Sequence, residues 1–291
     1  MTAIELLGRC DFPASDAALP LGVSGGADSL AMALLAIESG LDIVVWHIDH
    51  GLRPEAGADV DFVSKFAADV GAAFELRQVD IAPGGDLESR AREARYAALP
   101  ADVCVGHTAD DRAETVLLNL FRGAGLTGVA ARMTRVHRPL LRLRRHETEA
   151  VCSAAGITPL DDAMNHDPAF RRVGVRSRLL PAIAEEFDRD PVPLLNRHAD
   201  LVADALAVIE NEAHAIDATD VAALRGAPPA VAGEAVRRWM AATIGTSAGI
   251  DRAAVERALL VVDGTHVATE LPGGHRLART GGVLRIEPVA K

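Results

Sequence analysis

Six consecutive residues, Ser24-Gly25-Gly26-Ala27-Asp28-Ser29, combine residue types that suit the binding of a phosphate chain. Two adjacent glycines after a strand let the backbone turn sharply and point N–H groups at a ligand. The helical pattern that follows adds the positive end of a helix dipole, and the two serines add hydroxyl donors. No Gly-Lys-Ser/Thr follows, so the segment is not a Walker A loop. Asp28 repels phosphate unless Mg²⁺ lies between them, which makes it a candidate metal ligand.

Three carboxylates open a second predicted helix at Asp110, Asp111 and Glu114. Positions four apart share a helix face, so we expect Asp110 and Glu114 to lie together with Asp111 beside them. Such a cluster can hold the ammonium group of a small amino acid. The alternative is that these carboxylates only complement the positive end of the helix dipole. His107, just before them, is either a buried structural histidine or a group that orients a phosphate or carboxylate.

Arginines are concentrated in two parts of an otherwise acidic chain. The net charge of −11 argues against bulk attraction of nucleic acid. No acidic residue lies between Thr115 and His146, a stretch whose arginines are Arg122, Arg132, Arg135, Arg138, Arg142, Arg144 and Arg145. A second cluster consists of Arg171, Arg172, Arg176 and Arg178. These arginines form either a solvated face or a local basic patch that binds nucleic acid.

The elements that position these residues alternate between strand and helix in the first half of the chain. The predicted strands are Leu19–Val23, Asp42–Ile48, Phe74–Ile81 and Val103–Val105, and the predicted helices are Ala58–Val70, Leu87–Leu99 and Ala109–Phe121. This alternation predicts an α/β fold with a doubly wound parallel sheet. Because ligands bind such sheets where the winding reverses, we expect the glycine loop, Trp46–His50 and Gly106-His107 to converge on one crevice. Pro20 must lie at a strand start or at an unpaired position.

After Arg145 the pattern becomes helical and then ends in short strands. The predicted helices are Glu147–Ala155, Val175–Phe187, Leu194–Ile209, Ala235–Ala242 and Ala253–Val262, and the strands are His266–Leu271, His275–Arg279 and Val283–Pro288. Two prolines two apart cannot continue a helix, so Asp190–Pro193 is predicted to be a linker. We therefore expect a catalytic domain over residues 1–189. A small C-terminal domain of helices followed by a β-hairpin would occupy residues 190–291.

Composition places the chain among ordinary globular proteins. It has 291 residues, of which 49% are hydrophobic and 24% charged. The sequence shows no membrane-length apolar stretch and no signal-peptide pattern. Its cysteines, Cys10, Cys104 and Cys152, form no Cys-x-x-Cys pair and are expected to be reduced thiols. We therefore expect a cytoplasmic protein, and no feature of the sequence indicates an oligomeric state.

The glycine segment resembles the pyrophosphate-binding loop (PP-loop) of the N-type ATP pyrophosphatases. Further segments resemble, in order and spacing, the tRNA(Ile)-lysidine synthase family. They are His47–Arg53, Leu87–Tyr96, Gly106–Thr115, Leu120–Leu126, Arg138–Leu141, Asp161–Asp167 and Leu179–Pro181. The resemblance covers roughly residues 18 to 187. It implies an adenine nucleotide alpha hydrolase-like catalytic domain and a small tRNA-binding C-terminal domain.

The resemblance also implies a reaction. The family adenylates the C2 carbonyl of the wobble cytidine in the isoleucine tRNA with a CAU anticodon, using ATP, and free L-lysine then displaces AMP to form lysidine. By resemblance, Ser24–Ser29 bind ATP, Asp28 is the catalytic residue and Mg²⁺ ligand, and Asp111 and Glu114 bind lysine. The tRNA-binding residues would be Arg122, Arg132, Arg135, Arg138, Arg142, Arg172 and Arg176.

Three departures from the family pattern and three competing functions remain open at this point. Arg112 replaces the usual Gln, Met164 replaces a small hydroxyl residue, and Gly174 removes a phosphate contact that is common there. A tRNA thiolase of the same superfamily needs catalytic cysteines or an iron–sulfur cluster, for which no motif is present. A small-molecule synthetase would not explain the arginine-rich stretch. A nucleotide sensor without activity would leave Asp28 and the carboxylate cluster unused.

Overall fold

The computed structural model describes residues 3–49, 56–79, 94, 96–131, 136–161, 167, 170–245 and 250–289. The chain divides into two compact units. The first comprises residues 1–124 and 131–199, and the second comprises residues 125–130 and 200–291. Among the described helices, none is both long and apolar enough to cross a membrane. The boundary between the two units lies at residues 199–200, inside the helix Pro191–His214. A catalytic domain that ends at residue 189 therefore stays a prediction.

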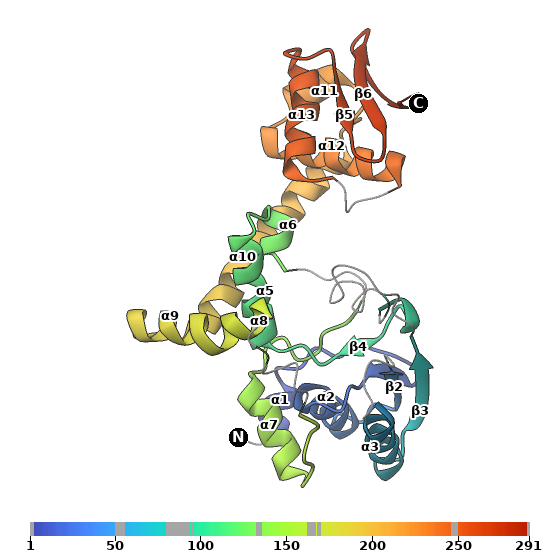
Figure 1. Ribbon diagram of the computed structural model, residues 1–291, viewed down its shortest axis with the longest axis vertical. Coiled ribbons are helices and arrows are strands. Elements are labelled where there is room, and N and C mark those ends of the chain that lie inside the picture. The colour runs from blue at the N-terminus through green and yellow to red at the C-terminus, as the bar shows by residue number, and fades with distance from the viewer. Residues whose placement is uncertain are drawn as a thin grey trace. The chain divides into compact units, whose positions relative to one another are not determined.

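The first unit is built on a four-stranded parallel sheet, as predicted (Figure 1). Its strands are β1 (Leu19–Gly22), β2 (Ile43–Asp49), β3 (Ala73–Gln78) and β4 (Cys104–Val105). They lie in the order β3-β2-β1-β4, and every neighbouring pair is parallel. The order reverses at β1, so the loops after β1 and β4 lie at the switch point where such sheets bind ligands.

Helices of the first unit occupy most of the predicted positions. They are α1 (Ala3–Leu7), α2 (Ala27–Glu38), α3 (Ala56–Asp69), α5 (Ala109–Phe121), α7 (Arg145–Ala154), α8 (Arg171–Gly174), the π-helical turn η2 (Val175–Leu179), α9 (Leu180–Phe187) and the start of α10 (Pro191–His214). Helix α5 has the bounds that the sequence predicts, whereas α1 was not predicted. Most of the predicted helix over 87–99, and the motif residues His50–Arg53, lie outside the described residues.

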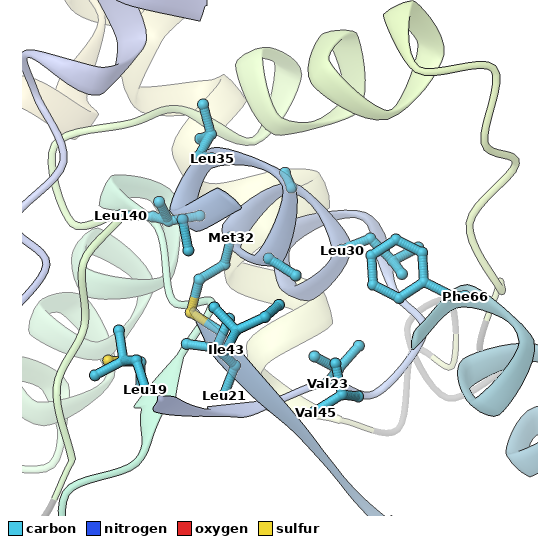
Figure 2. Packing of buried hydrophobic residues seen from close by; sticks show 14 of the residues in the cluster. Leu19, Leu21, Val23, Leu30, Met32, Leu35, Ile43, Val45, Phe66 and Leu140 are labelled. Atoms are coloured by element: carbon cyan, nitrogen blue, oxygen red, sulfur yellow. The ribbon is translucent and has the colours of Figure 1, made fainter. Parts of the chain in front are cut away.

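The core of the first unit forms where α2 packs on the central strands (Figure 2). Leu21 and Val45 point from β1 and β2 into this core, and Leu30 and Met32 meet them from α2, all with no exposed surface. Pro20 pairs in register with Val44, while β4 pairs with β1 only from Leu21 onward. Pro20 therefore lies near the strand start, beyond the reach of β4, where its missing N–H is tolerated.

The predicted linker at Asp190–Pro193 is wrong, because α10 begins there. Pro191 is the first residue of the helix. The Asp190 carboxylate accepts a hydrogen bond from the backbone N–H of Val192 at 3.0 Å, as a capping residue does. First-turn N–H groups have no intrahelical acceptor, so prolines in this turn cost no hydrogen bond. The paired prolines mark a helix start instead of an interdomain connection.

The second unit has its own core and contains the predicted C-terminal helices and strands. Its elements are α6 (Leu126–Val129), most of α10, α11 (Val221–Gly226), α12 (Pro229–Ile244), α13 (Arg252–Asp263), β5 (Ala268–Leu271), β6 (His275–Thr280) and β7 (Val283–Pro288). The three strands form an antiparallel sheet in the order β5-β6-β7. Met240 of α12 packs in one buried cluster with Leu277 and Leu284 of this sheet.

Candidate active site

The glycine segment forms a tight loop between β1 and the first turn of α2. Gly25 is buried and has φ +89°, a conformation that favours glycine. A Cβ atom at Gly25 would lie 2.5 Å from Cδ1 of Leu160, and the Leu160 N–H donates to the Gly25 carbonyl at 2.9 Å. Leu160 therefore packs against the loop backbone at Gly25, and only glycine fits at this position.

The two serines of the loop have different surroundings. The Ser29 hydroxyl donates to the Gly26 carbonyl at 2.9 Å and accepts from the Ser24 N–H at 3.1 Å. Ser29 thus shapes the loop, whereas Ser24 is exposed. Gly26 is the N-cap of α2 and provides no side-chain cap. The Ser29 N–H donates to the Gly26 carbonyl at 3.1 Å, which leaves the N–H groups of Ala27 and Asp28 for a ligand, as in other anion-binding helix starts.

Gly106, at the end of β4, lies against the backbone of the loop. A Cβ atom there would lie 2.6 Å from the Asp28 carbonyl oxygen and 2.8 Å from the Ser29 nitrogen. These atoms belong to the backbone between Asp28 and Ser29, so no flexible side chain can move aside. The absence of a side chain at Gly106 is what lets β4 approach the start of α2.

We expect Gly106→Ala to destabilise the protein by about 1–3 kcal/mol, because overpacking a close backbone contact forces a shift of the loop. Urea unfolding monitored by circular dichroism measures this change. Gly233→Ala is the matched control, since a Cβ atom in the middle of α12 would meet Val255 at an ordinary 3.7 Å. That control should be neutral or stabilising by up to about 1 kcal/mol. Equal stability of the Gly106→Ala and wild-type proteins would show that the close approach is dispensable.

Asp28 lies at the start of α2, at the edge of a charged cluster. Its Oδ1 accepts a hydrogen bond from the buried Thr148 hydroxyl of α7, and its Oδ2 lies 3.6 Å from Nε of Arg145. Burial, followed by the nearby charge of Asp111, raises the pKa of Asp28 to about 6. A bound cation would favour the ionised form of this carboxylate.

Asp110 connects the starts of α5 and α7. Its two carboxylate oxygens accept hydrogen bonds from Nε and Nη2 of Arg144, both at 3.0 Å. The backbone N–H of Arg145 donates to the same carboxylate at 2.9 Å. Arg144 also pairs with Asp190. The sequence pattern grouped Asp110 with Glu114, but Asp110 is committed to this bidentate ion pair.

Asp111 both caps α5 and pairs with an arginine. One oxygen accepts from the Thr108 N–H at 2.9 Å and from the Thr108 hydroxyl at 3.1 Å. The other oxygen lies 2.9 Å from Nη2 of Arg145. Burial by itself would raise the pKa of Asp111, but the charges of Arg145 and His107 outweigh it and lower the pKa below its ordinary value. Asp111 is therefore ionised at neutral pH.

Glu114 is fully buried and surrounded by guanidinium groups. Arg176 donates to both of its oxygens, from Nε at 2.7 Å and from Nη2 at 3.3 Å. Nη1 of Arg145 lies at 3.3 Å, and Nε of Arg172 lies at 3.0 Å. Three arginines from two segments of the chain thus neutralise one carboxylate, as a buried charge requires.

The structure separates the predicted tRNA-binding arginines into different settings. Arg122 and Arg142 are exposed, and Arg138 donates to the Ala131 carbonyl at 3.1 Å. Arg132 and Arg135 lie outside the described residues. Arg172 and Arg176 lie among the carboxylates, so a contact of these two with tRNA stays a prediction and requires a change of partners.

Arg144 and Arg145 are the site residues that the sequence interpretation missed. Both were counted as part of a basic stretch, yet their side chains contact Asp110, Asp111, Glu114 and Asp28. The signal that could have found them is charge balance, because buried carboxylates need paired cations nearby. Arg144 and Arg145, just before the predicted helix Glu147–Ala155, could have been recognised as these cations.

A pocket of about 230 Å³ adjoins this cluster. Its lining includes charged and apolar residues, the charged ones being Asp110, Glu114, Arg144, Arg145, Arg176 and Asp190 and the apolar ones Leu180, Pro181, Ala184, Pro191 and Val192. A lining that combines charged and aliphatic side chains suits an amphipathic molecule of small size. Over the described ranges, no group of three or more His, Cys, Asp or Glu side chains could hold a metal ion by itself.

Sequence comparison relates this chain to known proteins. A family model described as a PP-loop domain matches residues 5–183. A tRNA(Ile)-lysidine synthase from Salinispora arenicola is 37% identical, over 90% of this chain and 88% of that protein. Another, from Thermus thermophilus, is 38% identical over 93% of this chain. The alignment covers only 57% of the Thermus protein, so the chain spans little more than half of that relative's length.

Structural comparison agrees on the fold. A U34-tRNA thiolase from Methanococcus maripaludis, solved with its [4Fe-4S] cluster, superimposes with a TM-score of 0.57. The match covers 69% of this chain and 76% of the thiolase at 18% identity, which shows a common fold and no more. The sequence matches are closer and extend over most of the chain. The chain therefore belongs to the tRNA(Ile)-lysidine synthase family of PP-loop proteins.

Proposed function

We propose that the protein ligates free L-lysine to C2 of the wobble cytidine of the isoleucine tRNA with a CAU anticodon, through an adenylated tRNA. One geometric observation carries this proposal. The Arg145 guanidinium group lies 3.6 Å from Asp28, 2.9 Å from Asp111 and 3.3 Å from Glu114. One arginine thus lies near both the proposed phosphate loop and the proposed amine-binding carboxylates, which supports a single site for a two-step ligation.

In the first step, the cytidine carbonyl oxygen attacks the α-phosphorus of ATP and diphosphate leaves. The loop from Ser24 to Ser29 and the N-terminus of α2 would hold the phosphates through backbone N–H groups. When bound, a Mg²⁺ ion would neutralise part of the negative charge of the phosphates. Mg²⁺ usually takes one or two protein carboxylates together with substrate phosphates, and Asp28, with its side chain 22% exposed, fits that role.

In the second step, the uncharged ε-amine of lysine attacks C2 of the cytidine, AMP leaves, and the amine gives up a proton. Asp111 and Glu114 would bind the α-ammonium group, and the apolar lining residues Leu180, Pro181 and Ala184 would contact the methylene chain. Catalysis would rest on positioning, since ATP provides the leaving group and lysine the nucleophile. No covalent enzyme intermediate is needed.

An assay of AMP release tests the proposal directly. Wild-type protein would be incubated with ATP and Mg²⁺, with lysine and an isoleucine tRNA transcript each present or omitted. We expect sustained AMP release only when both are present, together with one lysine incorporated for each AMP. AMP release that depends on neither would contradict the proposed reaction.

A tRNA thiolase activity is the second candidate, and the cysteines argue against it. Cys104 and Cys152 are buried. Burial raises the pKa of Cys104 to about 12 and that of Cys152 to about 11. A sulfur-transfer enzyme needs an accessible cysteine with thiolate character or cluster ligands. The likeness to the thiolase supports only a common fold.

We also propose that tRNA binds along the exposed arginines Arg122 and Arg142, with further contacts from residues 190–291. The double variant Arg122→Glu/Arg142→Glu should weaken tRNA binding and leave ATP binding unchanged. The slope of log affinity against log salt should become shallower by about 0.9 for each phosphate that the variant no longer neutralises. Filter binding at several salt concentrations measures this slope. Lys65→Glu, a charge reversal on the exposed face of α3, is the control. If the double variant has the same slope as the wild-type protein, Arg122 and Arg142 do not contact tRNA phosphates and are only solvated.

A further inference from the structure

The carboxylate proposed to bind lysine is enclosed by arginines in this structure. It accepts three hydrogen bonds, from Nη1 of Arg145 and from Nε and Nη2 of Arg176, and Nε of Arg172 lies 3.0 Å from it without donating one. Glu114 also has no exposed surface. An ammonium group can therefore reach it only if an arginine withdraws.

Arg145 is the least suited of the three arginines to withdraw. Its side chain also contacts Asp111 and Asp28, and its backbone N–H holds Asp110. Arg172 and Arg176 come instead from the segment 171–179 and their side chains are each 31% exposed, although Arg172 also donates to the Thr115 hydroxyl at 2.8 Å. Arg176 contacts Glu114 and, at 3.9 Å, Asp111. A long side chain that reaches its partner from a solvent-facing segment can exchange that partner without unfolding a helix.

The same segment presents positive charge to solvent. Arg172 and Arg176, four residues apart, point to the carboxylates, whereas Arg171 and Arg178 are exposed. A nucleic acid attracted to the exposed pair would bring phosphates close to the inward pair. Guanidinium groups bind phosphate bidentately as well as carboxylate, so a phosphate can compete with Glu114 for them.

We propose that Arg172 and Arg176, the arginine pair, occupy the ammonium subsite of Glu114 in the free protein and leave it for tRNA phosphates. Lysine binding then depends on tRNA binding, so free lysine, an abundant amino acid, does not fill the site before the nucleic acid arrives. This inference rests on the proposed function and adds an order of binding to it. Thermodynamic linkage requires that lysine strengthen tRNA binding by the same factor.

Equilibrium dialysis with radiolabelled L-lysine tests the arginine pair, with a non-hydrolysable ATP analogue present throughout. For the wild-type protein we expect the isoleucine tRNA transcript to tighten lysine binding by about tenfold, within the usual range of coupling. Arg176→Gln should bind lysine about tenfold more tightly than wild type without tRNA, because one competing cation is gone. Arg178→Gln, which removes an exposed charge from the same segment, should bind lysine as wild type does when tRNA is absent.

Three results would overturn the inference. Lysine affinity of the wild-type protein that is unchanged by tRNA would mean that the site is already open, and this measurement needs no variant. Unchanged or weaker lysine binding by a folded Arg176→Gln protein would make Arg176 part of the lysine site. Both results leave the proposed reaction intact. Lysine binding that is absent under every condition would instead overturn the lysine site itself, and the inference with it.

Discussion

Asp28→Asn should reduce AMP release from ATP, in the presence of lysine and the tRNA transcript, by about a hundredfold or more. Asp28 is the carboxylate at the phosphate loop, and its charge is the feature proposed to hold Mg²⁺ against the phosphates. Losing one electrostatic group that stabilises a transition state typically lowers the rate 10²–10³-fold. A coupled AMP assay at saturating ATP measures the effect.

The fold should survive this substitution. Asparagine keeps an oxygen that accepts the Thr148 hydrogen bond. Because burial raises the pKa of Asp28 to about 6, the folded state prefers the uncharged group and loses stability as pH rises from about 4 through 6. A neutral amide should therefore not lower Tm at pH 8. Asp42→Asn changes an exposed carboxylate just before β2, at the amino ends of the strands and away from the loop after β1, and is the matched control. Wild-type AMP release by folded Asp28→Asn would remove Asp28 from the mechanism.

Glu114→Gln should raise the KM for lysine by about ten- to hundredfold while adenylated tRNA still forms without lysine. A hydrogen bond to a charged group contributes about 1.5–3 kcal/mol, which corresponds to that change in affinity. The two half-reactions should separate because the phosphate loop supports the first and the carboxylates support the second. Thin-layer analysis of labelled AMP–tRNA follows the first half-reaction, and lysine incorporation follows the second.

The burial of Glu114 requires a second variant. Removing its charge leaves Arg145, Arg172 and Arg176 without a common partner, and breaking a buried ion pair can cost about 3–5 kcal/mol. Asp111→Asn keeps an oxygen for the Thr108 cap and should raise the KM for lysine with less loss of stability. Glu185→Gln, on the exposed side of α9, controls for loss of a charge. Blocked adenylation with unchanged lysine affinity would assign the carboxylates to the ATP or metal site.

Local patterns in the sequence were sufficient for most of the first unit. The glycine segment after a short apolar strand and the helical pattern of Ala109–Phe121 are signals carried by residues close together in the chain. They placed the glycine loop before α2 and the bounds of α5 correctly. Short elements such as α1 and α11 were not predicted, because five or six residues carry too little periodicity. The linker predicted at Asp190–Pro193 was wrong because a proline such as Pro191 occurs at a helix start as readily as at an interruption.

The sequence by itself thus determined the family, the parallel sheet and the loop at its switch point. Only the tertiary structure decided which charges meet. Arg145 and Arg176 are 31 and 62 residues from Glu114 in the chain, yet both donate to its carboxylate. Ion pairing depends on distance in space and on burial, neither of which is encoded in local spacing. For that reason a stretch of arginines that suggested a basic surface contains two of the cations, Arg144 and Arg145, that pair with the carboxylates of the candidate active site.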